Sequence, residues 1–262
     1  MPSPAADSLA SNLRDAFSVY SKTCGERVER FPGVTCVRHQ SKTSAFNMAF
    51  LNGGAGVGQR TLRSAQDFYR EIGAEWCFIV PPELAGLFDS AMGRIQISQR
   101  KVLPTMVLSR GRVSMPPPLT GLDVRRVKSL DELRTWVSTA SMGFEDSQNT
   151  FRYMMNRSSL APGGFTCHTG FASGKAVSTS ASYTSVGVTG VFAVSTVPFA
   201  RGRGYGEAMT WAAVRDGLSR GSDTLYLQAS PMGFPLYHRM GFRRVFDFEA
   251  WVVPKDAPNA RD

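Results

Sequence analysis

A glycine-rich turn between a buried strand and a helix is the part of this sequence best suited to chemistry. Residues 191–206 read VFAVSTVPFARGRGYG, where an apolar run ends at Val197 and a helix is expected from Tyr205. The first N–H groups of a helix lack partners within it, and the helix dipole favours negative charge there. Glycines let the backbone approach an anion closely, and Arg201 and Arg203 add charge-assisted contacts. We therefore predict a phosphate-binding loop.

Three named phosphate loops can be compared with this turn. A Walker A loop requires Gly-x-x-x-x-Gly-Lys followed by Ser or Thr, and no lysine follows here. The dinucleotide fingerprint Gly-x-Gly-x-x-Gly is met by Gly202 and Gly204 but fails at Glu207. The pattern Gln/Arg-x-x-Gly-x-Gly/Ala is met in full by Arg201, Gly204 and Gly206.

A second spaced pattern follows the loop. Residues 225–242 read LYLQASPMGFPLYHRMGF, with Tyr237 four residues before Gly241-Phe242. In this order the two motifs resemble the GNAT superfamily of N-acetyltransferases, whose pyrophosphate loop has the Gln/Arg pattern and whose next short helix carries such a Tyr. Many GNAT proteins have Asn seven residues before this Tyr. Here the position holds Ser230, which departs from the family but still donates a hydrogen bond.

The resemblance covers about residues 119–252 and implies a direct transfer of an acetyl group from acetyl-CoA to a primary amine, without a metal. It implies that the free backbone of Val194, Ser195 and Thr196 binds the pantetheine arm like an added strand. Tyr237 would protonate the departing thiolate. The remaining implied cofactor contacts are Arg201, Gly202, Arg203, Gly204, Tyr205, Gly206 and Ser230.

The resemblance leaves the group that removes the amine's proton open. Many relatives use a Glu, but residues 225–227 read Leu-Tyr-Leu, with no carboxylate at the strand position that some relatives use. Other candidates are Glu145, His168, Asp247 and Glu249. An α-amino group, with a pKa near 8, needs less help than a lysine near 10.4.

The elements that must position these residues alternate between strand and helix. Pro116–Pro118, in the run MPPP, cannot continue a helix or donate to a ladder, so we expect a linker that divides the chain into residues 1–118 and 119–262. In the second part, strands are expected at 122–127, 164–172, 175–183, 188–197, 225–229 and 245–253, the last with one wet face. Helices are expected from 131 after a Ser129/Glu132 capping box, and at 151–156, 205–220 and 234–240.

The first part is also mixed in strand and helix signals. Strands are expected at 46–51, 77–80 and 105–108, and helices at 64–73 and 83–93. This order looks like a degenerate GNAT-like half without a cofactor loop, preceding an active one. The fold class is therefore expected to be α+β, a mixed sheet with flanking helices in two GNAT-like halves. Residues 53–58, GGAGVG, are expected to form a flexible turn.

Composition limits the class of protein. The 262 residues, 42% of them hydrophobic, suffice for a sizeable core, and no apolar run reaches the length of a membrane span. The N-terminus lacks the features of a signal peptide, so we expect a cytoplasmic protein. The four cysteines form no CxxC pair or zinc spacing and are expected to be reduced and structural.

Two other functions compete with the enzyme. A non-catalytic CoA-binding sensor or scaffold would explain the missing Glu and the Ser230 departure. A nucleic-acid-binding module would explain the net charge of +9, but the basic residues are spread along the chain, and a phosphate-bearing cofactor explains the charge as well. The acceptors left open are small amines, amino acids, antibiotics, peptide N-termini and lysine side chains.

Overall fold

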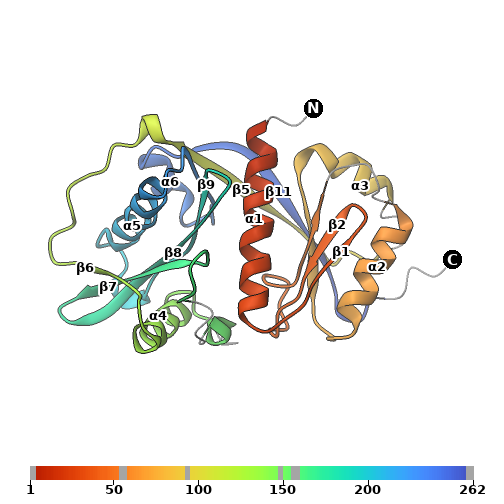
Figure 1. Cartoon of the computed structure of the whole chain (residues 1–262), viewed down its shortest axis with the longest axis horizontal. Coiled ribbons are helices and arrows are strands. Elements are labelled where there is room, and N and C mark those ends of the chain that lie inside the picture. Colours follow the sequence, from red (N-terminus) through yellow and green to blue (C-terminus); the bar gives the residue numbers. More distant parts are fainter. Residues whose placement is uncertain (1–3, 53–57, 92–94, 147–149, 155–159, 258–262) are drawn as a thin grey trace. The chain divides into compact units, whose positions relative to one another are not determined.

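The computed structural model describes residues 4–52, 58–91, 95–146, 150–154 and 160–257, which form two compact units (Figure 1). The first unit comprises Met1–Ala10, Phe17–Thr105 and Phe246–Asp262, and the second comprises Ser11–Ala16 and Met106–Val245. Helix α1 (Pro4–Thr23) and strands β5 (Gln99–Ser109) and β11 (Arg243–Val253) therefore contribute residues to both units.

The first unit carries a mixed sheet with the strand order β1-β2-β3-β4-β11, followed by the first part of β5. Strands β3 and β4 run parallel, whereas β1–β2, β2–β3 and β4–β11 are antiparallel pairs. The bounds of its remaining elements are β1 Val28–Phe31, β2 Val34–Val37, β3 Met48–Leu51, α2 Gln59–Arg70, β4 Trp76–Val80, η1 Pro82–Leu84 and α3 Ala85–Ala91.

The second unit has the strand order β5-β10-β9-β8-β7-β6, in which β9 and β10 are parallel and the pairs from β6 to β9 are antiparallel. Its strands are β6 Asp123–Arg126, β7 Thr166–Ala172, β8 Lys175–Ser185, β9 Val188–Thr196 and β10 Thr224–Gln228. Its helices are η2 Arg110–Arg112, α4 Leu130–Gly143, η3 Thr150–Met154, η5 Pro198–Ala200, α5 Tyr205–Ser219 and α6 Phe234–Arg239. The fold is α+β, as predicted.

Helices α4 and α5 cover opposite faces of the second unit's sheet. Neighbouring residues of β8 point to opposite faces, because side chains alternate along a strand. The Ser178 hydroxyl and Met209 of α5 both lie against Gly170 of β7. The next residue, Thr179, hydrogen-bonds to Ser195 Oγ at 2.8 Å, and Ser195 lies against α4. The side chains of β8 and β9 therefore face either α4 or α5.

Two local predictions are confirmed. The hairpin between β7 and β8 turns at Ser173 and Gly174, with φ values of 48° and 74°, as a tight two-residue turn requires. At the start of α4, Ser129 Oγ accepts the Glu132 N–H at 3.2 Å, and the Glu132 carboxylate accepts the Ser129 N–H at 3.1 Å. Both arms of the capping box are thus present.

Other predictions differ from the structure. The sequence analysis did not predict α1, β1 or β2. By their contacts, the two compact units divide after Thr105 and after Val245. Residues 106–118 belong with the second unit, and the end of β11 pairs with β4 of the first. The predicted solvent-exposed face is wrong for the second half of β11. There Trp251 and Val253 are buried, because this half is an inner strand of the first unit.

Among the described residues, no helix has both the length and the apolar character that a membrane crossing needs. The expected turn at 53–58 lies outside the described residues except for Gly58, the N-cap of α2.

Replacing Ser129 by Ala should lower the free energy of unfolding by about 1 kcal/mol, because an N–H at the start of α4 loses its acceptor. Urea unfolding, followed by circular dichroism, measures the change. The matched control is Ser138→Ala at an exposed position of the same helix, where the unfolding midpoint should stay the same or rise slightly. Equal midpoints for the two variants would show that the capping box contributes nothing.

Candidate functional site

Strands β9 and β10 part before they end. Their parallel pairing runs from Val188↔Thr224 to Gly190↔Tyr226 and stops there, although β9 continues to Thr196. Beyond Gly190 the side of β9 that faced β10 has no strand partner among the residues that the structure describes. Backbone N–H and C=O groups on an open strand edge can bind an extended ligand as an added strand. The edge includes residues 194–196, which the sequence analysis assigned to this role.

A bulge lies just beyond this point. Ala193 has a φ of 49°, in the left-handed region that a residue with a Cβ adopts at a cost of about 1 kcal/mol or more. The register between β8 and β9 shifts between Thr179 and Ala181, opposite the same segment. Because a bulge bends the strand and increases its twist, it turns the end of β9 away from β10.

The turn that follows β9 presents the start of α5 without a side-chain cap. Gly202 and Gly204 both have a φ of 79°, which favours glycine at these two positions. Gly204 is the N-cap of α5, and no side chain in the described part of the chain caps this helix, so its first N–H groups remain available to an anion. Arg203 and both glycines are exposed, whereas Tyr205 and Gly206 are half-buried. This geometry is compatible with an anion at the start of α5, and the cofactor contacts assigned to residues 201–206 remain predictions.

The Arg201 side chain forms hydrogen bonds within the protein. Its Nε donates to Thr196 O at 3.2 Å, and its Nη2 donates to Gly143 O at 3.0 Å and to Glu145 Oε1 at 2.8 Å. Arg201 therefore ties the last turn of α4 to the end of β9 and compensates the negative end of the α4 dipole. The predicted direct contact between Arg201 and the cofactor remains a prediction.

Ser230 lies in the turn before α6, and Tyr237 lies within this helix. Burial raises the pKa of Tyr237 to about 12, so the phenol stays protonated near neutral pH. Its ring packs edge-on against Phe242, with centroids 6.0 Å apart. Ser230 is exposed, and its Oγ accepts the Gly233 N–H at 3.1 Å, which leaves the hydroxyl proton available to a ligand. The second sequence motif thus forms a turn at Ser230–Gly233, followed by the short helix α6.

The four candidates for removing the proton do not come together. Glu145 is the ion-pair partner of Arg201. His168 pairs with Ser180 of β8, which places it two strand spacings, about 10 Å, from β9. Burial lowers the pKa of His168 below its ordinary value. Asp247 and Glu249 belong to the first unit, where Glu249 accepts the Trp251 indole N–H at 2.7 Å.

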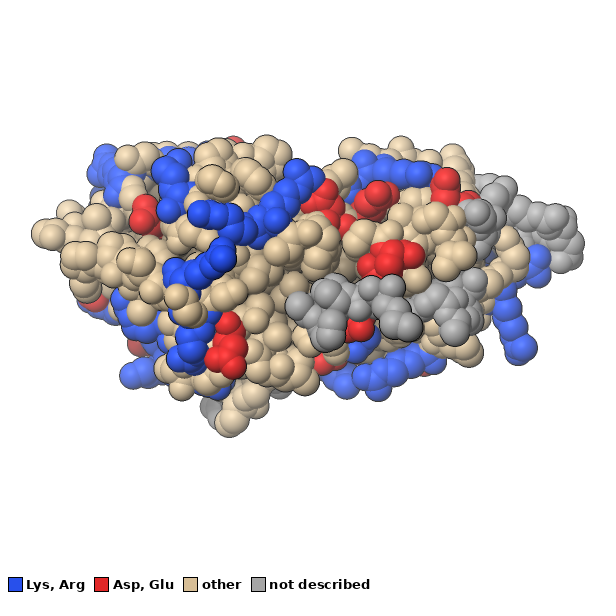
Figure 2. Space-filling model, turned by 90° about the horizontal axis from the view of Figure 1, so that it is seen from above, with Lys and Arg blue, Asp and Glu red and all other residues tan. Residues whose placement is uncertain are grey.

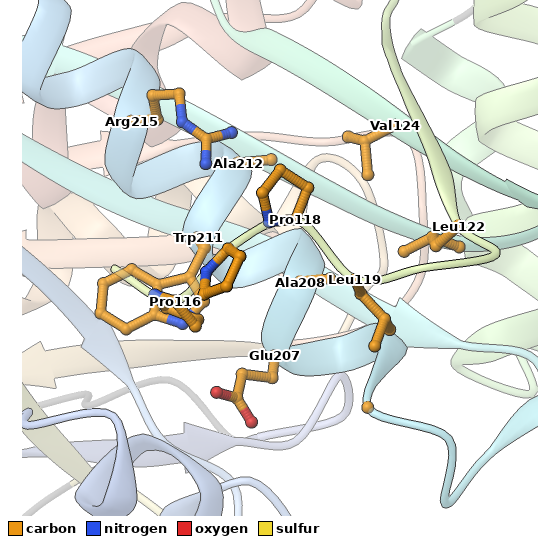
Figure 3. A pocket seen from close by; sticks show the side chains of 12 residues that line it. Pro116, Pro118, Leu119, Leu122, Val124, Glu207, Ala208, Trp211, Ala212 and Arg215 are labelled. Atoms are coloured by element: carbon orange, nitrogen blue, oxygen red, sulfur yellow. The ribbon is translucent and has the colours of Figure 1, made fainter. Parts of the chain in front are cut away.

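A hollow of about 400 Å³ runs along the outer side of α5 (Figure 3). The proline run 116–118 forms one wall, over Trp211 and Ala212 of the helix. Glu207 lies toward one end and Arg215 toward the other, and within the described part of the chain neither forms an ion pair. The lining is mostly apolar, so this hollow differs in chemistry from the phosphate loop, although Gly204 lines it as well.

A buried contact that the sequence analysis missed lies on the α4 side of the sheet. Tyr226 Oη donates to Asn12 Oδ1 of α1 at 2.9 Å, and Asn12 Nδ2 donates to Ser185 Oγ at 2.9 Å and to Val188 O at 3.0 Å. The signal in the sequence is Asn12 within the otherwise apolar helical stripe of Leu9, Leu13, Ala16 and Tyr20. Its partners are more than 170 residues away, so no local sequence pattern could predict them.

The basic residues gather in part on one face. Figure 2 shows a band of Lys and Arg side chains over the second unit, with acidic side chains beside it. Such a band raises the local concentration of anionic ligands. Among the described residues, no three His, Cys, Asp or Glu side chains are arranged to hold a metal ion.

The fold and site now allow a comparison with known proteins. No protein-family model and no curated protein matches this chain. Among solved structures, a GCN5-related N-acetyltransferase from Kribbella flavida matches over 95% of both chains, with a TM-score of 0.71 and 18% sequence identity. One from Sphaerobacter thermophilus matches over 100% of this chain and 95% of its own, with a TM-score of 0.60 and 13% identity.

A tandem GNAT protein from the clavulanic acid biosynthesis pathway also matches, over 95% of both chains, with a TM-score of 0.57 and 12% identity. This chain therefore has the GNAT fold, in the tandem arrangement of two GNAT-like halves that the sequence analysis predicted.

The cysteines are poor nucleophiles. Cys77 and Cys167 are buried, and burial raises their pKa values to about 12; burial also raises the pKa of Cys36. Desolvation has the largest share in the rise of the Cys24 pKa to about 12. Since the thiolate is the reactive form, none of these groups is activated for attack.

We predict that the native protein reacts slowly with Ellman's reagent at pH 8. With a pKa of about 12, only about one thiol in 10,000 is ionised at this pH, against roughly one in four for a free cysteine. The measurement is the absorbance of released thionitrobenzoate, with the same protein in guanidinium as the control that exposes all four thiols. Rapid reaction of a thiol in the native protein would contradict the prediction.

Proposed function

We propose that this protein transfers an acetyl group from acetyl-CoA to a primary amine. The observation that carries the proposal is the parting of β9 and β10 after Gly190, followed along the chain by an uncapped helix N-terminus. An open strand edge suits the amide groups of pantetheine, and the start of α5 suits a pyrophosphate. The two features lie in the order in which an extended acyl-CoA presents these groups.

The residues proposed to hold acetyl-CoA are those expected from the sequence. The backbone of residues 194–196 would bind pantetheine, the turn 201–206 would hold the pyrophosphate, and the Ser230 hydroxyl would donate to the cofactor. Gly206 lies close to this path, since a Cβ built on it would be 3.7 Å from Thr196 Oγ1 and from Leu236. The fit thus rests mostly on backbone groups.

In the proposed reaction the amine nitrogen forms a bond to the thioester carbonyl carbon, and the carbon–sulfur bond breaks. Tyr237 gives its proton to the leaving thiolate, and the proton lost by the amine restores the phenol through solvent. With a pKa of about 12 for Tyr237 and 8.5 for a thiol, this transfer is uphill by about 5 kcal/mol. A turnover of 10 per second allows a barrier of about 16 kcal/mol, so the step is accessible.

A second function is favoured by one specific observation. Residues 225–227 of β10 carry no carboxylate, and Glu145 is held by Arg201, which suits a protein that binds CoA without acetylating an amine. Such a CoA-binding sensor and the enzyme would both bind acetyl-CoA. They differ in thiol release, which only the enzyme would show when an amine is added.

Replacing Gly204 by Val should weaken acetyl-CoA binding at least tenfold. A β-branched residue is strained at a φ of 79°, and a Cβ at this position would lie 3.5 Å from Leu119 Cδ2, so the turn that presents the helix N-terminus would have to shift. Isothermal titration calorimetry with acetyl-CoA measures the dissociation constant. The control is Gly221→Val, at a φ of 83° just beyond the other end of α5, which imposes the same strain away from the loop. Unchanged affinity in Gly204→Val, or an equal loss in both variants, would refute the loop assignment.

Replacing Tyr237 by Phe should lower kcat about 100-fold or more and change the acetyl-CoA dissociation constant less than about threefold, since only the proton donor is removed. Thiol release with an amine panel gives kcat. Tyr153→Phe, in η3, serves as the control and should keep the wild-type rate. If Tyr237→Phe also turns over like the wild type, Tyr237 is not the acid.

A further inference from the structure

The two faces of the opened strand pair carry different chemistry. Tyr237 packs in one cluster with Leu225 and Leu227 of β10, on the side of α5 and α6. Tyr226, between these two leucines, points to the opposite face, where it meets Asn12. Gln228 follows on the same face as Tyr226, beyond the last residue of β10 that pairs with β9. A molecule that approaches the strand opening from this second face therefore meets different side chains.

This second face includes a donor without a partner. Within the described part of the chain, the Gln228 side-chain nitrogen is buried and makes no hydrogen bond. A buried polar group in this state is unfavourable by about 1–3 kcal/mol until a ligand or water pairs with it. From the end of β10 this nitrogen can donate to a ligand or to water.

The same face has a carboxylate from a distant part of the chain. Asp15 lies one turn after Asn12 on α1, and residues three apart share a helix face. Asn12 is fixed against Tyr226 and Val188, so Asp15 is held on the face of the strand pair to which Tyr226 points. Tyr226 is also the last residue of β10 that pairs with β9. Burial, and after it the negative charge of Asp15, raises the pKa of both Tyr183 and Tyr226, as expected for a carboxylate on this face. The Asp15 side chain is 34% exposed, and the one ion-pair contact that it makes within the described residues, to Arg14 Nε, is long at 3.8 Å.

Aromatic rings complete this surface. Phe192 of β9 lies edge-on to Tyr226, with centroids 6.3 Å apart, and Phe165 packs on Phe192 at 5.7 Å and on Tyr183 at 5.4 Å. The two tyrosines are buried, but Phe165 and Phe192 are half-buried and present apolar surface. Phe192 is next to the bulge at Ala193, where the strand pair has opened.

We propose that Asp15, Phe165 and Phe192 form the acceptor side of the site and select a cationic primary amine that carries an apolar, ring-bearing group. This inference rests on the proposed acetyl transfer and names its substrate class. The ammonium group lies at Asp15 and the ring packs on the two phenylalanines. The amine thus reaches the strand opening from the face opposite Tyr237. An acceptor with a carboxylate in place of the amine is repelled by Asp15.

Calorimetric titration tests the substrate class through binding, separately from turnover. Phenethylamine is titrated into the full chain in the presence of CoA, and 3-phenylpropionate, a ligand of similar shape and opposite charge, is the ligand control. We expect phenethylamine to bind and 3-phenylpropionate not to bind. Asp15→Asn should weaken phenethylamine binding about tenfold or more, because the ammonium group loses its charged partner.

The protein control is Asp7→Asn, an exposed position of the same helix about 12 Å away along its axis, which should bind phenethylamine like the wild type. Asp15→Glu, which keeps the charge, should recover part of the affinity, and all variants should bind acetyl-CoA like the wild type. Wild-type affinity for phenethylamine in Asp15→Asn, or no binding of phenethylamine to a wild-type protein that binds acetyl-CoA, would overturn this inference alone. A wild-type protein that does not bind acetyl-CoA would overturn the proposed function and this inference together.

Discussion

The candidate site depends on one constraint: two parallel strands that pair at their starts must separate before they end. Pairing stops at Gly190 and Tyr226, and Ala193 holds a left-handed conformation three residues later. A residue with a Cβ keeps such a conformation only when its surroundings over-determine it. Here they include the register shift to β8 and the Thr179 hydroxyl, which donates to Ala193 O at 2.9 Å. The strain thus creates the open edge on which the proposed binding of an extended ligand relies.

Arg201 shows how the loop stays in place without a side-chain cap. Its guanidinium joins the end of β9 to the last turn of α4, so the segment that leads into the two left-handed glycines is fixed at its start. An arginine in a phosphate-loop pattern is easily assigned to the anion. In this chain the Arg201 side chain holds the loop through hydrogen bonds to backbone carbonyls, and the loop's backbone N–H groups are the contacts available to the proposed anion.

Much of the second unit could be predicted, because its signals are local. The Ser129 capping box, the hairpin at Ser173-Gly174 and the glycine turn before α5 each depend on a few neighbouring residues, and each lies where the sequence placed it. The proposed cofactor side of the site follows from the same kind of signal. The acceptor side does not, because Asn12 meets Tyr226 across 214 positions of sequence, and no local pattern records such a contact. The burial of Trp251 was missed for the same reason, since it depends on the pairing of β11 with β4.

The contact between Asn12 and Tyr226 also has a consequence for the order of synthesis. Helix α1 leaves the ribosome before the strands on which it packs, so its buried asparagine lacks the partners of the folded state until β8, β9 and β10 have been made. The second unit cannot be completed by a contiguous stretch of nascent chain, and contacts of such high sequence separation form late. Until then, the incomplete chain exposes the apolar stripe of α1 to solvent. Because exposed apolar surface promotes association, aggregation competes with folding at this stage.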